Sequence, residues 1–160
     1  MKKIIALIAA VALVLSLSAC FMPNANNNSE STSDQANAAD ITSYDKDFDG
    51  LVKYINDRGS NYEKMDIYYD LIGADNGVRI VLNKNAFVEV YDFSGASANT
   101  AKAQEILNAV RENGKFKPIE DGTELTAAIT DSGKYVLAWD ASRSFDYTGK
   151  VVTDELKENW

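Results

Sequence analysis

Three aspartates at alternate positions, Asp45, Asp47 and Asp49, form the clearest candidate metal site in this chain of 160 residues. Gly50 follows them, so the segment matches the first ligand positions and the turn glycine of an EF-hand Ca²⁺ loop. The twelfth position is Asn56 and not glutamate, which removes one charge and at least one ligand oxygen. A helical apolar pattern also begins inside the segment, and a helix cannot wrap a cation. We interpret the segment as an acid-rich helix start, with a weak Ca²⁺ site as the alternative.

Candidates for catalysis are few, because the chain has no histidine and a single cysteine, Cys20. Imidazole bases, Ser–His and Cys–His pairs and histidine-ligated zinc are therefore excluded. Paired carboxylates could still hydrolyse a glycosidic bond, and Glu89, in a segment with a strand pattern, is the candidate acid for this reaction. The competing interpretation places Glu89 on a solvated sheet face, opposite Arg79 of the neighbouring strand. We predict that the protein is not an enzyme, with a small carboxylate-dependent hydrolase as the alternative.

A binding surface is the third candidate. Arg79, Glu89 and Tyr91 are expected on one face of adjacent strands, together with Thr126. If no helix covers that face, its charged and aromatic groups suit a protein or glycan partner. Aromatic side chains on strands mostly fill interiors, which favours a covered face. Arg79, Glu89 and Tyr91 are therefore a possible ligand face whose exposure decides its role.

The first twenty residues indicate where the chain is sent. Lys2 and Lys3 precede an unbroken apolar run over residues 4–15, which is typical of a secretory signal and too short for a lasting membrane span. Leu17-Ser18-Ala19-Cys20 ends this segment and resembles the lipobox of bacterial lipoproteins. The resemblance implies that the Cys20 thiol receives diacylglycerol, that the chain is cut before Cys20, and that the new amine is open to a further acyl chain. The alternative is an ordinary signal that happens to end in cysteine.

Residues 1–19 are thus expected to be a signal peptide, and residues 20–40 a lipidated cysteine followed by a disordered tether rich in Asn and Ser. The formal net charge is −8, and losing Lys2 and Lys3 with the signal takes it to −10. So acidic a surface repels phosphate backbones, and we expect no nucleic-acid partner. Because several acyl chains anchor stably, we expect an extracytoplasmic protein held to the bilayer by its lipid. Beyond that covalent lipid we expect no cofactor.

Residues 41–160 show the periodic apolar pattern of one globular domain. The expected helices cover residues 47–58, 65–72, 97–113 and 151–160, and the expected strands cover residues 78–83, 87–93, 125–130 and 135–139. Residues 65–72 also fit a strand, and Thr153 is the expected N-cap of the last helix. Two hairpins separated by a helix predict an α+β fold, in the order α-α-ββαββα. The expected core is an antiparallel four-stranded sheet with helices packed on it.

Residues 71–77 (Leu-Ile-Gly-Ala-Asp-Asn-Gly), 88–92 (Val-Glu-Val-Tyr-Asp) and 133–137 (Gly-Lys-Tyr-Val-Leu) are similar to motifs of a group of small, uncharacterised Gram-positive lipoproteins. The resemblance spans most of the domain and implies no activity, because none is known for the group. The sequence therefore predicts a membrane-anchored binding domain for an unknown protein or cell-envelope ligand. A cell-envelope hydrolase that uses carboxylates and a weakly Ca²⁺-binding lipoprotein are the alternatives.

Overall fold

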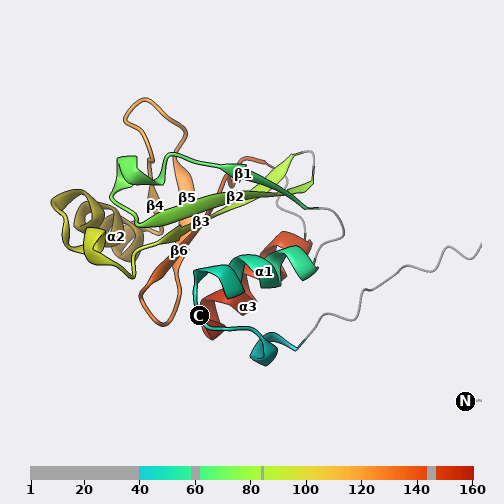
Figure 1. Ribbon diagram of the computed structural model, residues 1–160. Helices are drawn as coiled ribbons and strands as arrows, with labels where there is room; N and C mark the ends of the chain where they lie inside the picture. Colours follow the sequence, from blue (N-terminus) through green and yellow to red (C-terminus); the bar gives the residue numbers. More distant parts are fainter. Residues whose placement is uncertain (1–39, 59–61, 84, 144–146) are drawn as a thin grey trace, which may run out of the picture. The chain divides into compact units, whose positions relative to one another are not determined.

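The computed structural model describes residues 40–58, 62–83, 85–143 and 147–160 (Figure 1). The signal segment, Cys20 and the tether lie outside the described residues. All the described residues belong to one compact unit. Within the described ranges, no helix combines the length and the apolar character that crossing a membrane requires.

The described residues form a six-stranded, entirely antiparallel sheet, shown in Figure 1. Its strands are β1 (Glu63–Asp66), β2 (Asn76–Asn83), β3 (Ala86–Asp92), β4 (Lys115–Phe116), β5 (Leu125–Ile129) and β6 (Tyr135–Trp139), in the spatial order β1-β2-β3-β6-β5-β4. The predicted α+β class is confirmed, whereas the predicted four-stranded sheet is wrong. The two unpredicted strands are the edges; both are short and each carries a lysine, as edges that resist further strand pairing commonly do.

Three α-helices lie in the described part: α1 (Phe48–Arg58), α2 (Ala101–Asn113) and α3 (Tyr147–Asn159). The prediction of a helix over residues 65–72 is wrong, and so is the alternative prediction that these residues form a single strand. The segment divides between the end of β1 and a short 3₁₀ helix, η2 (Tyr69–Ile72), which Gly73 ends at φ +74°. Thr153 lies inside α3 and not at its N-terminus, so its predicted capping role is also wrong.

Helices α1 and α3 cover one face of the sheet (Figure 1). Val88 and Val90 of β3 point into this first core, where they meet apolar side chains of both helices. Trp160 joins the helices to each other, because its indole nitrogen donates a hydrogen bond to the Asp47 carbonyl and its ring packs against Tyr54. The apolar stripe predicted for α1 is confirmed, since Leu51 and its helical neighbours are buried here.

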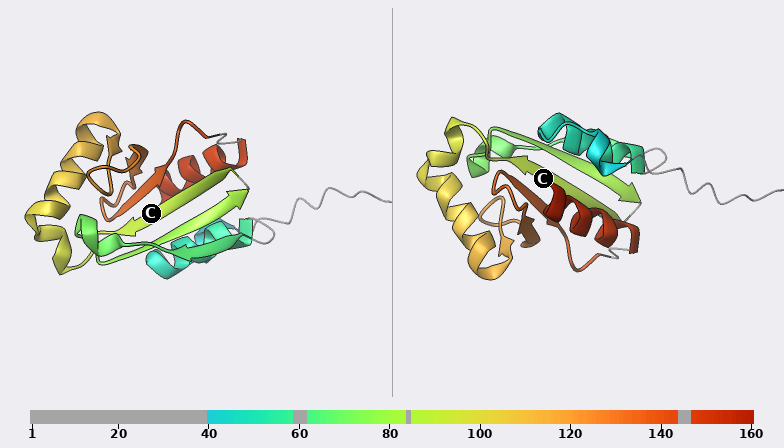
Figure 2. Two further views of the ribbon diagram at one scale, coloured as in Figure 1. Left: turned by 90° about the horizontal axis from the view of Figure 1, so that it is seen from above. Right: turned by 90° about the horizontal axis from the view of Figure 1, so that it is seen from below.

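The second face of the sheet is covered by a helix at one end only. Helix α2 packs against β4 and β5, and its apolar side chains belong to a second core that includes Tyr91, Phe93, Val136 and Ala138. Figure 2, left, shows α2 beyond the end of the sheet, and no helix of the described residues lies over the middle of β2 and β3. This uncovered area carries the residues considered below.

We expect residues 34–160 to fold alone, because both cores are built entirely within that unit. Urea unfolding followed by circular dichroism should give one cooperative transition. Its midpoint should match that of a chain that begins at residue 20 and carries Cys20→Ser. A broad transition, or a clearly lower midpoint for the shorter chain, would contradict this expectation.

Candidate functional site

A cavity of about 530 Å³ lies on the uncovered part of the second face. Its floor is formed by β2 and β3, and its walls by β1, η2, the loop between β4 and β5, and the turn after β6. This size is within the range of small-molecule pockets in proteins. The predicted ligand face lines it, since Arg79, Glu89 and Tyr91 all contribute to the cavity, while Thr126 does not.

Arg79 and Glu89 face each other across β2 and β3, and the predicted cross-strand pairing is confirmed. Arg79 Nε donates a hydrogen bond to Glu89 Oε1 at 2.8 Å, and Arg79 Nη2 donates to the same oxygen. The competing interpretation of a solvated Glu89 is wrong, because its side chain is only 3% exposed. Sequence alternation assigns Glu89 to this face, but the walls that bury it come from distant segments.

Tyr91 completes the environment of the carboxylate. Its hydroxyl donates a hydrogen bond to Glu89 Oε2 at 2.6 Å. Burial, and then the neighbouring Glu89 charge, raise the pKa of the Tyr91 hydroxyl above its ordinary value. The hydroxyl therefore stays protonated and acts as a donor at neutral pH. Both oxygens of Glu89 are thus occupied by donors from the pocket itself.

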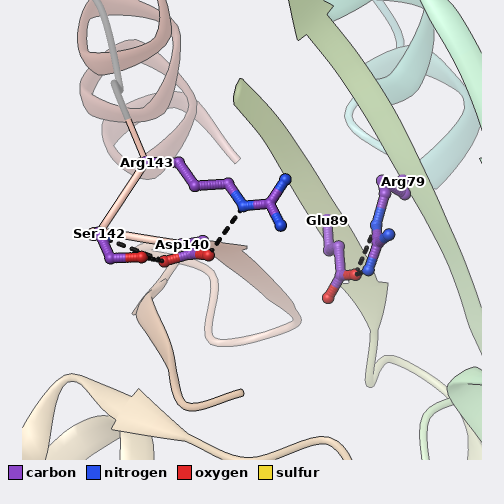
Figure 3. A network of polar contacts seen from close by, with 5 residues as sticks. All are labelled: Arg79, Glu89, Asp140, Ser142 and Arg143. Carbon is purple, nitrogen blue, oxygen red and sulfur yellow. Dashed lines mark hydrogen bonds and ion pairs between the residues drawn. The ribbon is translucent and has the colours of Figure 1, made fainter. Parts of the chain in front are cut away.

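A second ion pair lies on the wall formed by the turn after β6 and was missed by the sequence analysis. Asp140 follows β6 and accepts hydrogen bonds from the Ser142 amide at 2.9 Å, the Ser142 hydroxyl at 2.6 Å and Arg143 Nε at 3.1 Å. The Ser142 bonds, followed by Arg143, hold the pKa of Asp140 below its ordinary value. Figure 3 shows the Arg143 guanidinium pointing toward the Arg79–Glu89 pair. An aspartate two residues before a serine indicates such a turn, but nothing in the sequence places it beside Glu89.

The rim of the cavity is apolar. Four large apolar side chains of the described residues are exposed, by between 44% and 82%, and all four line this cavity: Met65, Tyr68, Leu71 and Ile119. Single exposed apolar residues are common on protein surfaces, but a group of them around one hollow is typical of a binding site. Three of these residues come from the β1–η2 segment and Ile119 comes from the β4–β5 loop. Residues that are far apart in the sequence therefore lie around one cavity.

The arrangement argues against carboxylate-dependent hydrolysis, although two acids line one cavity. A glycosidase needs one carboxyl group that is protonated near neutral pH and a second that can attack or activate water. The lowered pKa of Asp140 keeps that group ionised, so it cannot be the acid. Glu89 is held at both oxygens by Arg79 and Tyr91.

The predicted metal candidates lie on the other side of the sheet, at the start of α1. Asp47 Oδ1 accepts a hydrogen bond from the Gly50 amide at 2.8 Å and so caps the helix, while Asp45 and Asp49 are exposed. A Cβ on Gly50 would lie 2.0 Å from the Asp45 carbonyl oxygen, so this glycine serves a close backbone approach. In the described part of the chain, no group of three acidic side chains is placed to hold a metal ion.

Comparisons of this chain with protein-family models, with curated proteins and with solved structures find no match. The function of the cavity is therefore argued from its geometry.

Arg79→Leu is expected to lower the free energy of unfolding by about 2–4 kcal/mol, because it leaves the buried Glu89 carboxylate without its charged partner. The double variant Arg79→Leu/Glu89→Leu should lose less of its free energy of unfolding, because no uncompensated charge is left in the apolar pair. Urea unfolding of residues 34–160 measures both values.

Lys102→Ala is the matched control, since it breaks an exposed ion pair with Glu105 on α2. Lys102→Ala should lower the free energy of unfolding by less than about 1 kcal/mol. If Arg79→Leu costs no more than Lys102→Ala, or the double variant is the least stable of the set, the dependence of Glu89 on Arg79 is refuted.

Proposed function

We propose that this protein is a lipid-anchored, extracytoplasmic binding protein that holds its ligand in the cavity on the second face of the sheet. One observation carries the proposal: the large exposed apolar side chains of the described residues surround a cavity with a polar, hydrogen-bonded floor. Small-molecule sites commonly combine an apolar lining with a few fixed polar groups in this way. The lipobox-like segment ending at Cys20 supports the anchor.

Binding is favoured over catalysis because the polar groups are fixed to one another. Glu89 is held by Arg79 and Tyr91, and Asp140 by Ser142 and Arg143. Such pairs position donors without offering a proton donor or a nucleophile for turnover. The walls are also suited to contact, since Tyr68 is 82% exposed and Leu71 is 51% exposed beside the cavity.

A neutral apolar dye tests the binding function independently of charge. N-phenyl-1-naphthylamine should bind residues 34–160 with a saturable rise in fluorescence at one site. Leu71→Ser and Ile119→Ser should each weaken this binding by about threefold or more, because each removes apolar area that the dye would bury.

Ala101→Ser is the matched control, because Ala101 is an exposed alanine at the start of α2, outside the cavity. It should leave the dye affinity unchanged. An absence of saturable binding, or binding that Leu71→Ser and Ile119→Ser leave intact, would refute the cavity as the binding site.

Cys20→Ser tests the anchor. A serine oxygen cannot form the thioether to diacylglycerol, so the variant should leave the membrane pellet or accumulate as unprocessed precursor in the lipoprotein-processing host. Fractionation and mass spectrometry of the N-terminus measure these outcomes. Ser18→Thr is expected to remain anchored, because it keeps the cysteine. A Cys20→Ser protein that is cut and held to the membrane like the unaltered chain would contradict the proposal.

A further inference from the structure

The polar groups of the cavity have hydrogen-bond donors to spare. Arg79 uses Nε and Nη2 on Glu89, and Arg143 uses Nε on Asp140. Among the described residues, no acceptor is found for Arg79 Nη1 or for either terminal nitrogen of Arg143. The four carboxylate oxygens of Glu89 and Asp140 each accept at least one hydrogen bond already. A ligand that pairs with these spare donors must therefore bring acceptors.

The spare donors come from two guanidinium groups, that of Arg79 on the floor and that of Arg143 on the wall after β6. Arg79 is 37% exposed and lies over the Phe87 ring, with its guanidinium carbon 4.3 Å from the ring centre. Arg143 is 57% exposed, and Figure 3 shows its guanidinium directed toward the floor. Guanidinium groups match the planar, two-oxygen geometry of a carboxylate better than any other side chain does.

We infer that the cavity binds a small molecule in which a carboxylate is attached to an apolar body. This inference rests on the proposed binding function and specifies its ligand. The carboxylate accepts hydrogen bonds from Arg143 and Arg79, and the apolar body packs against the rim that includes Leu71 and Ile119. The size of the cavity admits an aliphatic or aromatic acid, or the C-terminal end of a peptide.

Because the charges around the cavity balance, the cavity distinguishes a carboxylate from a neutral group only at short range. The two arginines and the two paired carboxylates cancel, and Asp66 at the rim is exposed to water. The field of the site therefore does not attract an anion from a distance. Hydrogen bonds between charged partners are, however, about twice as strong as neutral ones, so a carboxylate gains more from the spare donors than a hydroxyl does.

Three probes with the same chain length separate charge from apolar contact: octanoate, octan-1-ol and octylammonium. Isothermal titration calorimetry of residues 34–160 should find octanoate bound at least about tenfold more tightly than octan-1-ol, with octylammonium the weakest. The dipeptide N-acetyl-Ala-Leu, as free acid and as C-terminal amide, distinguishes the source. A peptide acid that binds more tightly than octanoate indicates a peptide end, and the reverse order indicates a fatty acid.

Arg143→Gln is the decisive variant, because Arg143 is exposed at the wall and its removal leaves the Arg79–Glu89 pair intact. It should weaken octanoate binding by about tenfold and change octan-1-ol binding by less than about twofold. Arg111→Gln is the matched control, since it neutralises an exposed arginine of α2 outside the cavity. It should change neither affinity.

The possible failures differ from one another. If octan-1-ol or octylammonium binds as tightly as octanoate, and Ile119→Ser weakens that binding, the carboxylate inference is overturned while the binding cavity stands. Octanoate binding that Arg143→Gln leaves intact also overturns the inference. If none of the probes binds, and the neutral dye does not bind either, both the inference and the proposed function fail.

Discussion

Glu89 is a carboxylate buried on a central strand, and the second face of the sheet is arranged around keeping it paired. An uncompensated buried charge costs several kcal/mol, so the three donors supplied by Arg79 and Tyr91 are a condition for folding in this form. Tyr91 lies two residues from Glu89 on the same strand, but Arg79 faces Glu89 only in the observed register of β2 and β3. A slip of one residue would turn the carboxylate toward the first core, where Val88 and Val90 are fully buried. The ion pair therefore specifies strand pairing as well as the floor of the cavity.

This polar centre also explains why the two faces of the sheet differ. The first face offers aliphatic side chains along its length, and α1 and α3 cover it. On the second face, a helix laid over Arg79 would bury its remaining N–H groups without acceptors, at a cost of about 1–3 kcal/mol for each unsatisfied group. Helix α2 lies instead over the end where β3 presents Tyr91 and Phe93. The cavity lies over the uncovered part and is bounded by the β1–η2 segment, the β4–β5 loop and the turn after β6.

The sequence was a good guide where one apolar pattern decides the structure. Helix α1 and strands β2, β3, β5 and β6 lie close to their predicted ranges, because their buried positions repeat with the helical or strand period. The edge strands β1 and β4 were missed. β1 consists of four exposed residues and β4 of two residues, so each forms a strand only because it pairs with a neighbouring strand. The Arg79–Glu89 pair was predicted from alternation, but its burial was not. Alternation tells which face a residue takes and cannot tell whether distant loops build walls around that face.

For the proposed binding function, the pairing of the polar groups with one another is an advantage. An arginine held by a carboxylate and an aromatic ring, as Arg79 is by Glu89 and Phe87, loses little further side-chain freedom when a ligand arrives. Tyr91 remains a donor because burial and the Glu89 charge raise its pKa, so the floor keeps one pattern of donors through the neutral pH range. A site with a fixed floor and an apolar rim gains affinity from hydrogen bonds already oriented and from the area buried at the rim. Neither contribution requires a proton to move, which is why we propose binding and not catalysis for this cavity.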